Sequence, residues 1–254
     1  MKIVSVEMLH VDGGWDAWSY LKLTTDDGLV GWSEFNQSRG RRGLAAVIAD
    51  LSPLIVGEDP CRVGRLVARL NNLTQSTTGS LQSLAIGAYE NACLDLTAKS
   101  LGVPVHALFG GPLRDNLPVY WSHCGLYRAR HPALFEEVIG QPAVRGLDDL
   151  KRLGADAARR GFTALKTNLL VFEPGRPTVV GRGNGPFELN IDSAIVGRVV
   201  DQLAAFREGA GPSVALMIDL NFNYKPEGFR RIAHAVERFD LGWLEMDSHE
   251  PAAL

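Results

Sequence analysis

Two apolar segments that each end on a carboxylate constrain the fold of this chain more than any other feature. Residues 214–219 read Val-Ala-Leu-Met-Ile-Asp, and residues 241–245 read Leu-Gly-Trp-Leu-Glu. Short apolar runs of this kind are typical of strands buried on both faces of a parallel sheet. Because the carboxyl ends of parallel strands open onto one face, we expect Asp219 and Glu245 to converge there. Two carboxylates at matching strand ends indicate a site for a hard metal cation.

The predicted elements change their order at residues 110–112, which read Gly-Gly-Pro. The elements before this point are strands at 2–10, 20–25 and 29–34, and helices at 42–53, after Asp59-Pro60, and at 81–100. A turn signal at Asp26-Asp27-Gly28 joins the second and third strands as a hairpin. The first part of the chain therefore reads as an α+β domain.

After residue 112, strands and helices alternate. Strands are predicted at 117–122, 162–167, 213–219 and 241–245, and helices near 146–160, 191–208 and 226–238. This alternation is typical of βαβ units on a parallel sheet. A complete eight-stranded barrel takes about 250 residues, and far fewer follow residue 112. We therefore predict two domains, residues 1–112 and 113–254, of which the second is a partial (β/α) TIM-type barrel with about four strands.

Charge and composition exclude several classes of function. The net charge is −3 and the basic residues are scattered, which argues against a nucleic-acid partner. Cys61, Cys93 and Cys124 are odd in number and lack a CxxC spacing, so neither a disulfide framework nor a thiolate zinc site is predicted. Glu7 interrupts the first apolar run, and no stretch approaches the roughly 20 apolar residues that cross a bilayer. We expect a soluble, cytoplasmic protein with no membrane partner.

Four blocks of sequence in the first domain carry a family resemblance. They are Gly31-Trp-Ser-Glu34, Leu54-Ile-Val-Gly-Glu-Asp-Pro60, Ala88-Tyr-Glu-Asn-Ala-Cys-Leu-Asp95 and the stretch from Lys99 to Gly111. Each is a weak pattern, but the ordered set resembles the capping domain of the enolase superfamily, in particular its mandelate racemase and muconate lactonizing enzyme branch. The resemblance implies an α+β capping domain followed by a (β/α) barrel.

The second domain resembles the same family at three strand ends. These are Ala164-Leu-Lys-Thr-Asn168, Asp219-Leu-Asn221 and Trp243-Leu-Glu245. The resemblance implies that Asp219 and Glu245 are the first two Mg²⁺ ligands, and that Lys166 and Asn168 occupy catalytic positions. Removing the α-proton of a carboxylate creates an enediolate, whose extra charge Mg²⁺ stabilises. A nearby base must take the proton.

The identity of residue 168 bears on the reaction. Lys166 can act as the base or as a positive neighbour of the substrate carboxylate. Asn168 stands where many racemase-like relatives have a second lysine, and an amide accepts no proton at neutral pH. We therefore favour an electrostatic role for Lys166 and the dehydration of an acid sugar. A racemase or epimerase of a hydroxy acid is the alternative, and it needs a base on each face of the substrate.

Several further residues are candidates for binding the small carboxylate substrate. We expect Asn221, Trp18 and His249 to contact it, although Asn221 has the alternative role of shaping a turn. His123, at the end of the first predicted barrel strand, is interpreted as a packed or capping histidine. The glycine-rich stretch 169–189 lacks a P-loop pattern, so a lid or specificity loop is a better interpretation than phosphate binding.

The third metal ligand of the family has no counterpart in this chain. A further step equal to that between Asp219 and Glu245 leads to about position 270, beyond Leu254. We therefore expect weak activity or none, and a noncatalytic interaction fragment is a further alternative. An incomplete barrel exposes strand edges and apolar surface, which favours association. We expect either a homo-oligomer or a piece of a longer protein.

Overall fold

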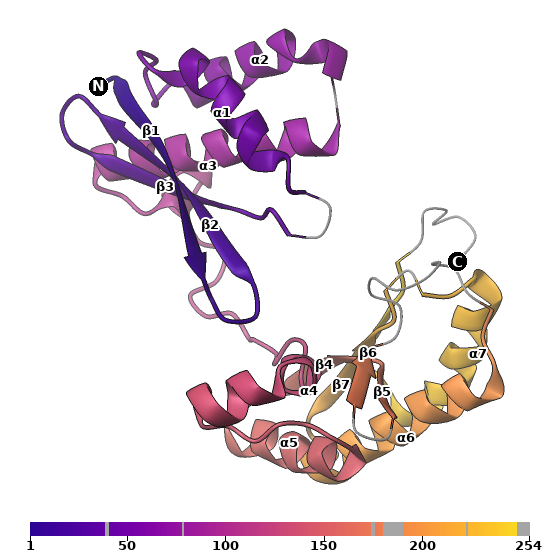
Figure 1. Ribbon diagram of the computed structural model, residues 1–254. Coiled ribbons are helices and arrows are strands. Elements are labelled where there is room, and N and C mark those ends of the chain that lie inside the picture. Colours follow the sequence, from indigo (N-terminus) through magenta and orange to yellow (C-terminus); the bar gives the residue numbers. More distant parts are fainter. Residues whose placement is uncertain (39–40, 78, 174–175, 180–189, 222, 248–254) are drawn as a thin grey trace. The chain divides into compact units, whose positions relative to one another are not determined.

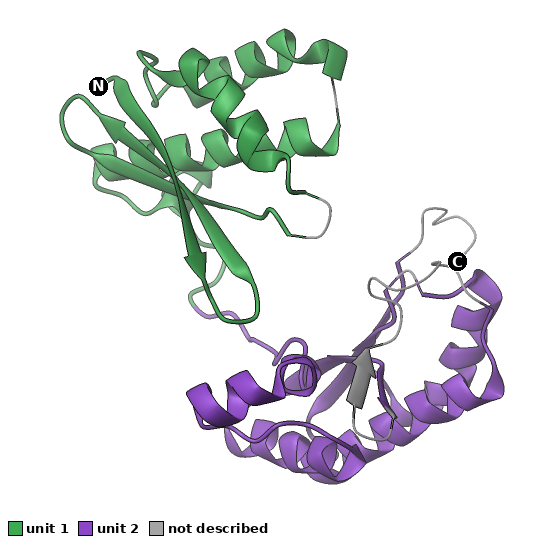
Figure 2. Cartoon of the chain, viewed as in Figure 1, with its two compact units in different colours: residues 1–115 green, residues 116–254 purple. Residues whose placement is uncertain are grey.

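The computed structural model describes residues 1–38, 41–77, 79–173, 176–179, 190–221 and 223–247. The chain divides into two compact units, Met1–Asp115 and Asn116–Leu254 (Figure 2). Each unit has a hydrophobic core of its own. None of the helices that the structure describes combines the length and the apolarity needed to cross a membrane.

The first unit is an antiparallel sheet covered by helices (Figure 1). The sheet has the order β1-β2-β3, with β1 at Ile3–Asp12, β2 at Ala17–Thr25 and β3 at Val30–Phe35. The helices are α1 (Leu44–Ile55), α2 (Val63–Leu73) and α3 (Ser80–Leu101), with short turns η1 (Gln75–Thr77) and η2 (Val105–Phe109). Gly28 adopts φ 86° in the β2–β3 turn, a conformation that glycine takes at little cost. The predicted hairpin and the three predicted helices are therefore confirmed.

The second unit is built around a parallel sheet with the order β4-β7-β8. The strands are β4 (Ala164–Asn168), β7 (Ala215–Asp219) and β8 (Trp243–Glu245), and the long helices are α5 (Leu147–Arg159), α6 (Ser193–Ala210) and α7 (Pro226–Val236). Shorter helical segments are α4 (Leu126–Arg130), the π-helix η3 (Leu134–Ile139) and η4 (Glu237–Phe239). The predicted alternation of strands and helices is confirmed from α5 onward.

A small hairpin follows β4 directly. Strands β5 (Leu170–Glu173) and β6 (Arg176–Val179) pair antiparallel, within the stretch that was predicted as a loop. Residues 180–189 of that stretch lie outside the described residues. The prediction of a lid therefore stays untested, but its first part is strand rather than loop.

The strand predicted at 117–122 is wrong. This segment forms a single parallel bridge, from Trp121 to Leu165, so the parallel sheet of the described residues has three strands instead of about four. Leu117 and Val119 are 71% and 68% exposed, so only the end of the segment, at Trp121, packs against the core and bonds to the sheet. Pro118 also lacks the N–H that a strand donates. Apolar residue types alone suggested a strand that tertiary packing does not form.

Two glycines let helices α5 and α6 approach closely. A Cβ atom at Gly209 of α6 would overlap the backbone carbonyl of Lys151 on α5. A Cβ atom at Gly154 of α5 would lie 2.8 Å from the carbonyl oxygen of Phe206. The backbones of the two helices are therefore in direct contact. Helices α5 and α6 form the helical layer that packs behind β4.

This contact predicts opposite effects for two glycine substitutions in α6. Gly209→Ala should lower the free energy of unfolding by about 1–3 kcal/mol or more, because the new methyl group meets rigid backbone. Gly197→Ala is the matched control, since its Cβ would enter open space, and it should raise stability by about 0.5–1 kcal/mol. Urea denaturation followed by circular dichroism measures both. Equal effects of the two substitutions would contradict the close helix contact.

Candidate active site

The carboxyl ends of the three parallel strands place three polar residues side by side. Asn168 of β4 pairs with Asp219 of β7, and Asp219 pairs with Glu245 of β8. The pairing continues beyond β7 and β8, because the backbone N–H of Leu220 donates to the carbonyl oxygen of Glu245 at 2.9 Å. Residues paired across neighbouring strands direct their side chains to the same face of the sheet. The convergence of Asp219 and Glu245 that the strand endings predict is thus present in the fold.

Lys166 links the two carboxylates. It lies two residues before Asn168 on β4, and therefore on the same face of the strand. Its Nζ atom lies 2.6 Å from Oε2 of Glu245 and 3.9 Å from Oδ2 of Asp219. The side chains of Lys166 and Asp219 are 10% and 5% exposed, whereas that of Glu245 is 37% exposed. A buried ammonium group thus sits between two carboxylates, one of which faces solvent.

The surroundings of Lys166 keep it charged. Burial lowers the pKa of Lys166, but the hydrogen bond and charge of Glu245, together with the charge of Asp219, outweigh burial and raise this pKa above its usual value. The Tyr120 ring, whose centroid is 6.0 Å from Nζ, adds a further favourable contact for a cation. In this arrangement Lys166 is a proton donor and a positive charge, and not a ready base.

Asp219 also holds the turn that follows β7. Its Oδ1 atom accepts a hydrogen bond of 2.8 Å from the backbone N–H of Asn221. Asn221 adopts φ 51°, a left-handed conformation that asparagine tolerates better than most residues. The turn-shaping role of Asn221 is therefore present, and its contact with substrate stays a prediction.

Asn168 connects the strand ends to His123. The Asn168 side chain is buried, and its Oδ1 atom lies 2.8 Å from Nδ1 of His123. An amide oxygen only accepts hydrogen bonds, so Nδ1 of His123 carries the hydrogen and Nε2 is the atom that can exchange a proton. The Asn168 amide nitrogen donates to the backbone carbonyl of Asp219 at 3.3 Å. His123, interpreted from sequence as a packed or capping residue, thus contacts a predicted site residue.

Gln202 of α6 holds the end of β4 through hydrogen bonds. It is 1% exposed, and its amide nitrogen donates to the carbonyl oxygen of Asn168 at 2.7 Å and to Oγ1 of Thr167 at 3.1 Å. Its amide oxygen accepts from the backbone N–H of Leu170 at 2.9 Å. Sequence analysis missed this residue. The available signal was an amide placed at helical spacing within the buried apolar stripe of α6.

Two predicted substrate contacts stay untested. Trp18 lies on β2 in the first unit, where it pairs with Val11 of β1 and is 38% exposed. His249 lies outside the described residues. Their binding roles stay predictions.

The donor set of the strand ends suits Mg²⁺. Asp219 and Glu245 supply carboxylate oxygens, the ligand type that this hard ion prefers, and both side chains already reach one positive charge. Among the described residues, no group of three or more His, Cys, Asp or Glu side chains gathers in a way that could hold a metal. Mg²⁺ is often held by one or two carboxylates, with water and substrate completing its shell. Two carboxylates can therefore form part of such a shell.

Comparison with known proteins identifies the family. Residues 15–110 match the mandelate racemase / muconate lactonizing enzyme N-terminal domain, and residues 149–250 match the enolase C-terminal domain-like family. The chain belongs to the mandelate racemase and muconate lactonizing enzyme branch of the enolase superfamily. The predicted family is confirmed, and with it the order of a capping domain followed by barrel elements.

Three relatives illustrate the similarity. A "D-galactonate dehydratase family member" of Streptomyces bingchenggensis is 29% identical over 96% of this chain and 57% of its own length. A crystal structure from Burkholderia xenovorans strain LB400, named for L-alanine-DL-glutamate epimerase, is 42% identical with a TM-score of 0.93 over 100% of this chain and 64% of that one. A second structure of that protein, which covers 99% of this chain and 62% of its own, contains magnesium and fumarate. The chain thus spans less than two thirds of the length of each.

The hydrogen bonds of Gln202 predict a large cost for its removal. Gln202→Leu should lower the free energy of unfolding by about 1–3 kcal/mol, because the buried N–H of Leu170 loses its partner. The neighbouring Asp201→Asn, at an exposed position of the same helix, should change stability by less than about 0.5 kcal/mol. Urea denaturation of both variants measures the difference. A Gln202→Leu protein as stable as the parent would contradict the stabilising role of the Gln202 hydrogen bonds.

Proposed function

We propose that the strand-end site binds Mg²⁺ and takes part in removing the α-proton of a small carboxylate substrate, with the dehydration of an acid sugar as the reaction. The observation that carries this proposal is the in-register pairing of Asp219 with Glu245, both of which reach the ammonium group of Lys166. This edge of the sheet holds a positive charge between two carboxylates. Such a site can hold a divalent cation in the same place.

In this proposal, Asp219 and Glu245 hold the metal. The bound Mg²⁺ supplies positive charge that stabilises the enediolate formed when the α-proton leaves. Lys166 provides a second positive charge for the substrate carboxylate, because an ordinary lysine ammonium group is protonated at neutral pH. Lys166 is therefore assigned an electrostatic role, in agreement with the interpretation of Asn168.

His123 is assigned to proton transfer. Its Nδ1–H is held by Oδ1 of Asn168, which leaves Nε2 to take or give a proton. Dehydration needs the α C–H bond to break, the β C–O bond to break with protonation of the departing hydroxyl group, and a double bond to form between the two carbons. The resulting enol then becomes a 2-keto acid, so one water molecule leaves for each substrate. Asn168 acts as a positioning residue, because it fixes the tautomer of His123.

The names of the relatives support two reactions. Dehydration agrees with the names of the galactonate dehydratases and dehydratase family members, which share 28–35% identity with parts or most of this chain. Epimerisation agrees with the name of the Burkholderia xenovorans protein, which shares 42% identity. Epimerisation requires a base on each face of the substrate, and the amide of Asn168 accepts no proton at neutral pH. We therefore place dehydration first.

Metal binding is the first test. Wild-type protein should bind Mg²⁺ in isothermal titration calorimetry, and Asp219→Asn and Glu245→Gln should each weaken binding by about tenfold or more, because each removes a charged oxygen ligand. Glu237→Gln is the matched control, since Glu237 is an exposed carboxylate of the same unit. Equal affinities for all four proteins would refute the assignment of these two ligands.

The reaction is tested with D-galactonate and Mg²⁺ in deuterated water. We expect a 2-keto acid to form slowly, in line with the weak activity predicted from the sequence, and His123→Gln to slow its formation by about a further 10²-fold, because the proton-transfer group is lost. His234→Gln, at an exposed position on α7, is the control and should leave the rate unchanged. Deuterium incorporation at the α-carbon without keto acid would favour the epimerase alternative. Intact Mg²⁺ binding with neither product would favour a noncatalytic fragment.

A further inference from the structure

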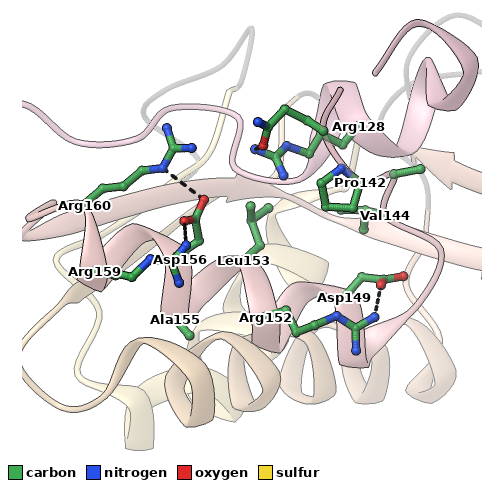
Figure 3. Close-up of a pocket in the computed structure, with 12 residues that line it drawn as sticks. Arg128, Pro142, Val144, Asp149, Arg152, Leu153, Ala155, Asp156, Arg159 and Arg160 are labelled. Carbon is green, nitrogen blue, oxygen red and sulfur yellow. Dashed lines mark hydrogen bonds and ion pairs between the residues drawn. The ribbon is translucent and has the colours of Figure 1, made fainter. Parts of the chain in front are cut away.

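An arginine-rich pocket lies in the second unit, formed by residues other than those of the strand-end site (Figure 3). Its volume is about 500 Å³, and it lies between α4, the segment 141–144 and α5. The charged lining residues are Arg128, Arg152, Arg159, Arg160, Asp149 and Asp156. Four guanidinium groups thus face two carboxylates, and the pocket carries an excess of two positive charges.

Both carboxylates of the pocket are already engaged. Asp149 pairs with Arg152, and Asp156 pairs with Arg159 and, at 3.1 Å, with Nε of Arg160. The dashed lines of Figure 3 trace these contacts along α5. Each carboxylate thus pairs with arginines in or directly after α5, and Asp156 acts through its charge, without an ion pair, on the cation that enters the pocket from α4.

That remaining cation is Arg128. The residue is 8% exposed, and in the part of the chain that the structure describes it forms no ion pair with a carboxylate. Its guanidinium lies over the rings of Trp121 and Phe135, at 5.6 and 5.9 Å from their centroids. One N–H donates to Oε1 of Gln141 at 3.3 Å. Aromatic faces and one neutral amide therefore hold a charge that normally requires a counterion when buried.

The cost of burying the charge of Arg128 favours the binding of an anion beside it. Burial lowers the pKa of Arg128, which reflects the cost of keeping the charge away from water. Arginine nevertheless stays protonated in proteins, so the charge persists, and the acceptor of the hydrogen bond from its Nη2 atom is the neutral amide of Gln141. An oxyanion in the pocket would offset the desolvation cost and accept hydrogen bonds from the guanidinium group.

Arg160 supplies a second donor group close to the first. Its guanidinium carbon also lies 5.6 Å from the centroid of the Trp121 ring, so a single indole ring carries both cations. Figure 3 shows the ends of Arg128 and Arg160 in the same part of the pocket. Two guanidinium groups from separate elements can bind the oxygens of one tetrahedral anion, for which arginine is well suited.

We propose that this pocket binds a phosphate dianion, carried by a small phosphomonoester. The charge of the ligand matches the excess of two positive charges in the lining, and the volume exceeds what a phosphate ion alone fills, which leaves room for a small organic group. Arg128 and Arg160 bind the phosphate oxygens. Trp121 forms the apolar wall that holds both of them. This inference does not depend on the proposed metal site.

The pocket also has a direct connection to β4. The backbone N–H of Trp121 donates to the carbonyl oxygen of Ala164 at 3.1 Å, and the N–H of Lys166 donates to the carbonyl oxygen of Trp121 at 2.9 Å. A ligand that stabilises Arg128 and Arg160 against Trp121 therefore also stabilises the segment that pairs with β4.

The test is a titration of the full chain with inorganic phosphate and with glucose 6-phosphate, at constant ionic strength set with sodium chloride. Calorimetry should show binding of both, tighter for the sugar phosphate. Arg128→Gln and Arg160→Gln should each weaken binding by about tenfold or more, because each removes charge-assisted hydrogen bonds. The matched control is Arg238→Gln, since Arg238 is an exposed arginine that also lies over a ring, that of Phe239.

Two variants keep the test decisive. Arg160 is half exposed, so Arg160→Gln should fold even if the loss of buried Arg128 disturbs the unit, and circular dichroism checks both. Tighter binding of glucose 6-phosphate than of phosphate supports a phosphomonoester, and equal binding points to free phosphate as the source. Absence of binding by the wild-type chain, or equal weakening in Arg238→Gln, would overturn the proposal.

Discussion

The strand-end site depends on the two ion pairs that Lys166 forms with Glu245 and Asp219. These pairs exist only because three strands end in register, so that residues 168, 219 and 245 are direct neighbours across the sheet. A shift of one residue in any strand would turn its side chains to the other face. The packed layer of α5 and α6 and the hydrogen bonds of Gln202 hold β4 in that register. The packing of the helices therefore determines where the polar side chains of the site lie.

The features that could be predicted from the sequence are those set by short stretches of chain. The Asp26-Asp27-Gly28 turn and the apolar runs that end at Asp219 and Glu245 carry their own structural preferences, and all are found in the fold. The strand predicted at 117–122 failed because its residue types favour a strand but most of its side chains face solvent. Burial of a segment depends on what packs against it, and local sequence does not contain that information.

In the candidate site, too, some features could be predicted from the sequence and others could not. Asp219 and Glu245 are neighbours as predicted, because strand-end positions in a parallel sheet converge by geometry, whereas the ion pairs of Lys166 with both carboxylates were not predicted. The contact of Asn168 with His123 joins residues 45 apart, and Gln202 reaches Asn168 from a different helix. Such contacts depend on the tertiary placement of single polar atoms. Periodicity and motifs locate the elements, but they do not reveal which amide faces which imidazole.

The turn after β7 has a consequence for the way in which Asp219 can bind a cation. Because Oδ1 accepts the hydrogen bond of the Asn221 backbone N–H, Oδ2 is the less engaged of the two carboxylate oxygens of Asp219. In the proposed metal site, this tether would favour coordination through one oxygen. Monodentate coordination suits a small ion with a strict octahedral shell, whereas Ca²⁺ commonly gathers more oxygens, some of them in pairs from one carboxylate. The left-handed asparagine after the strand would then favour Mg²⁺ over Ca²⁺ without contacting the ion.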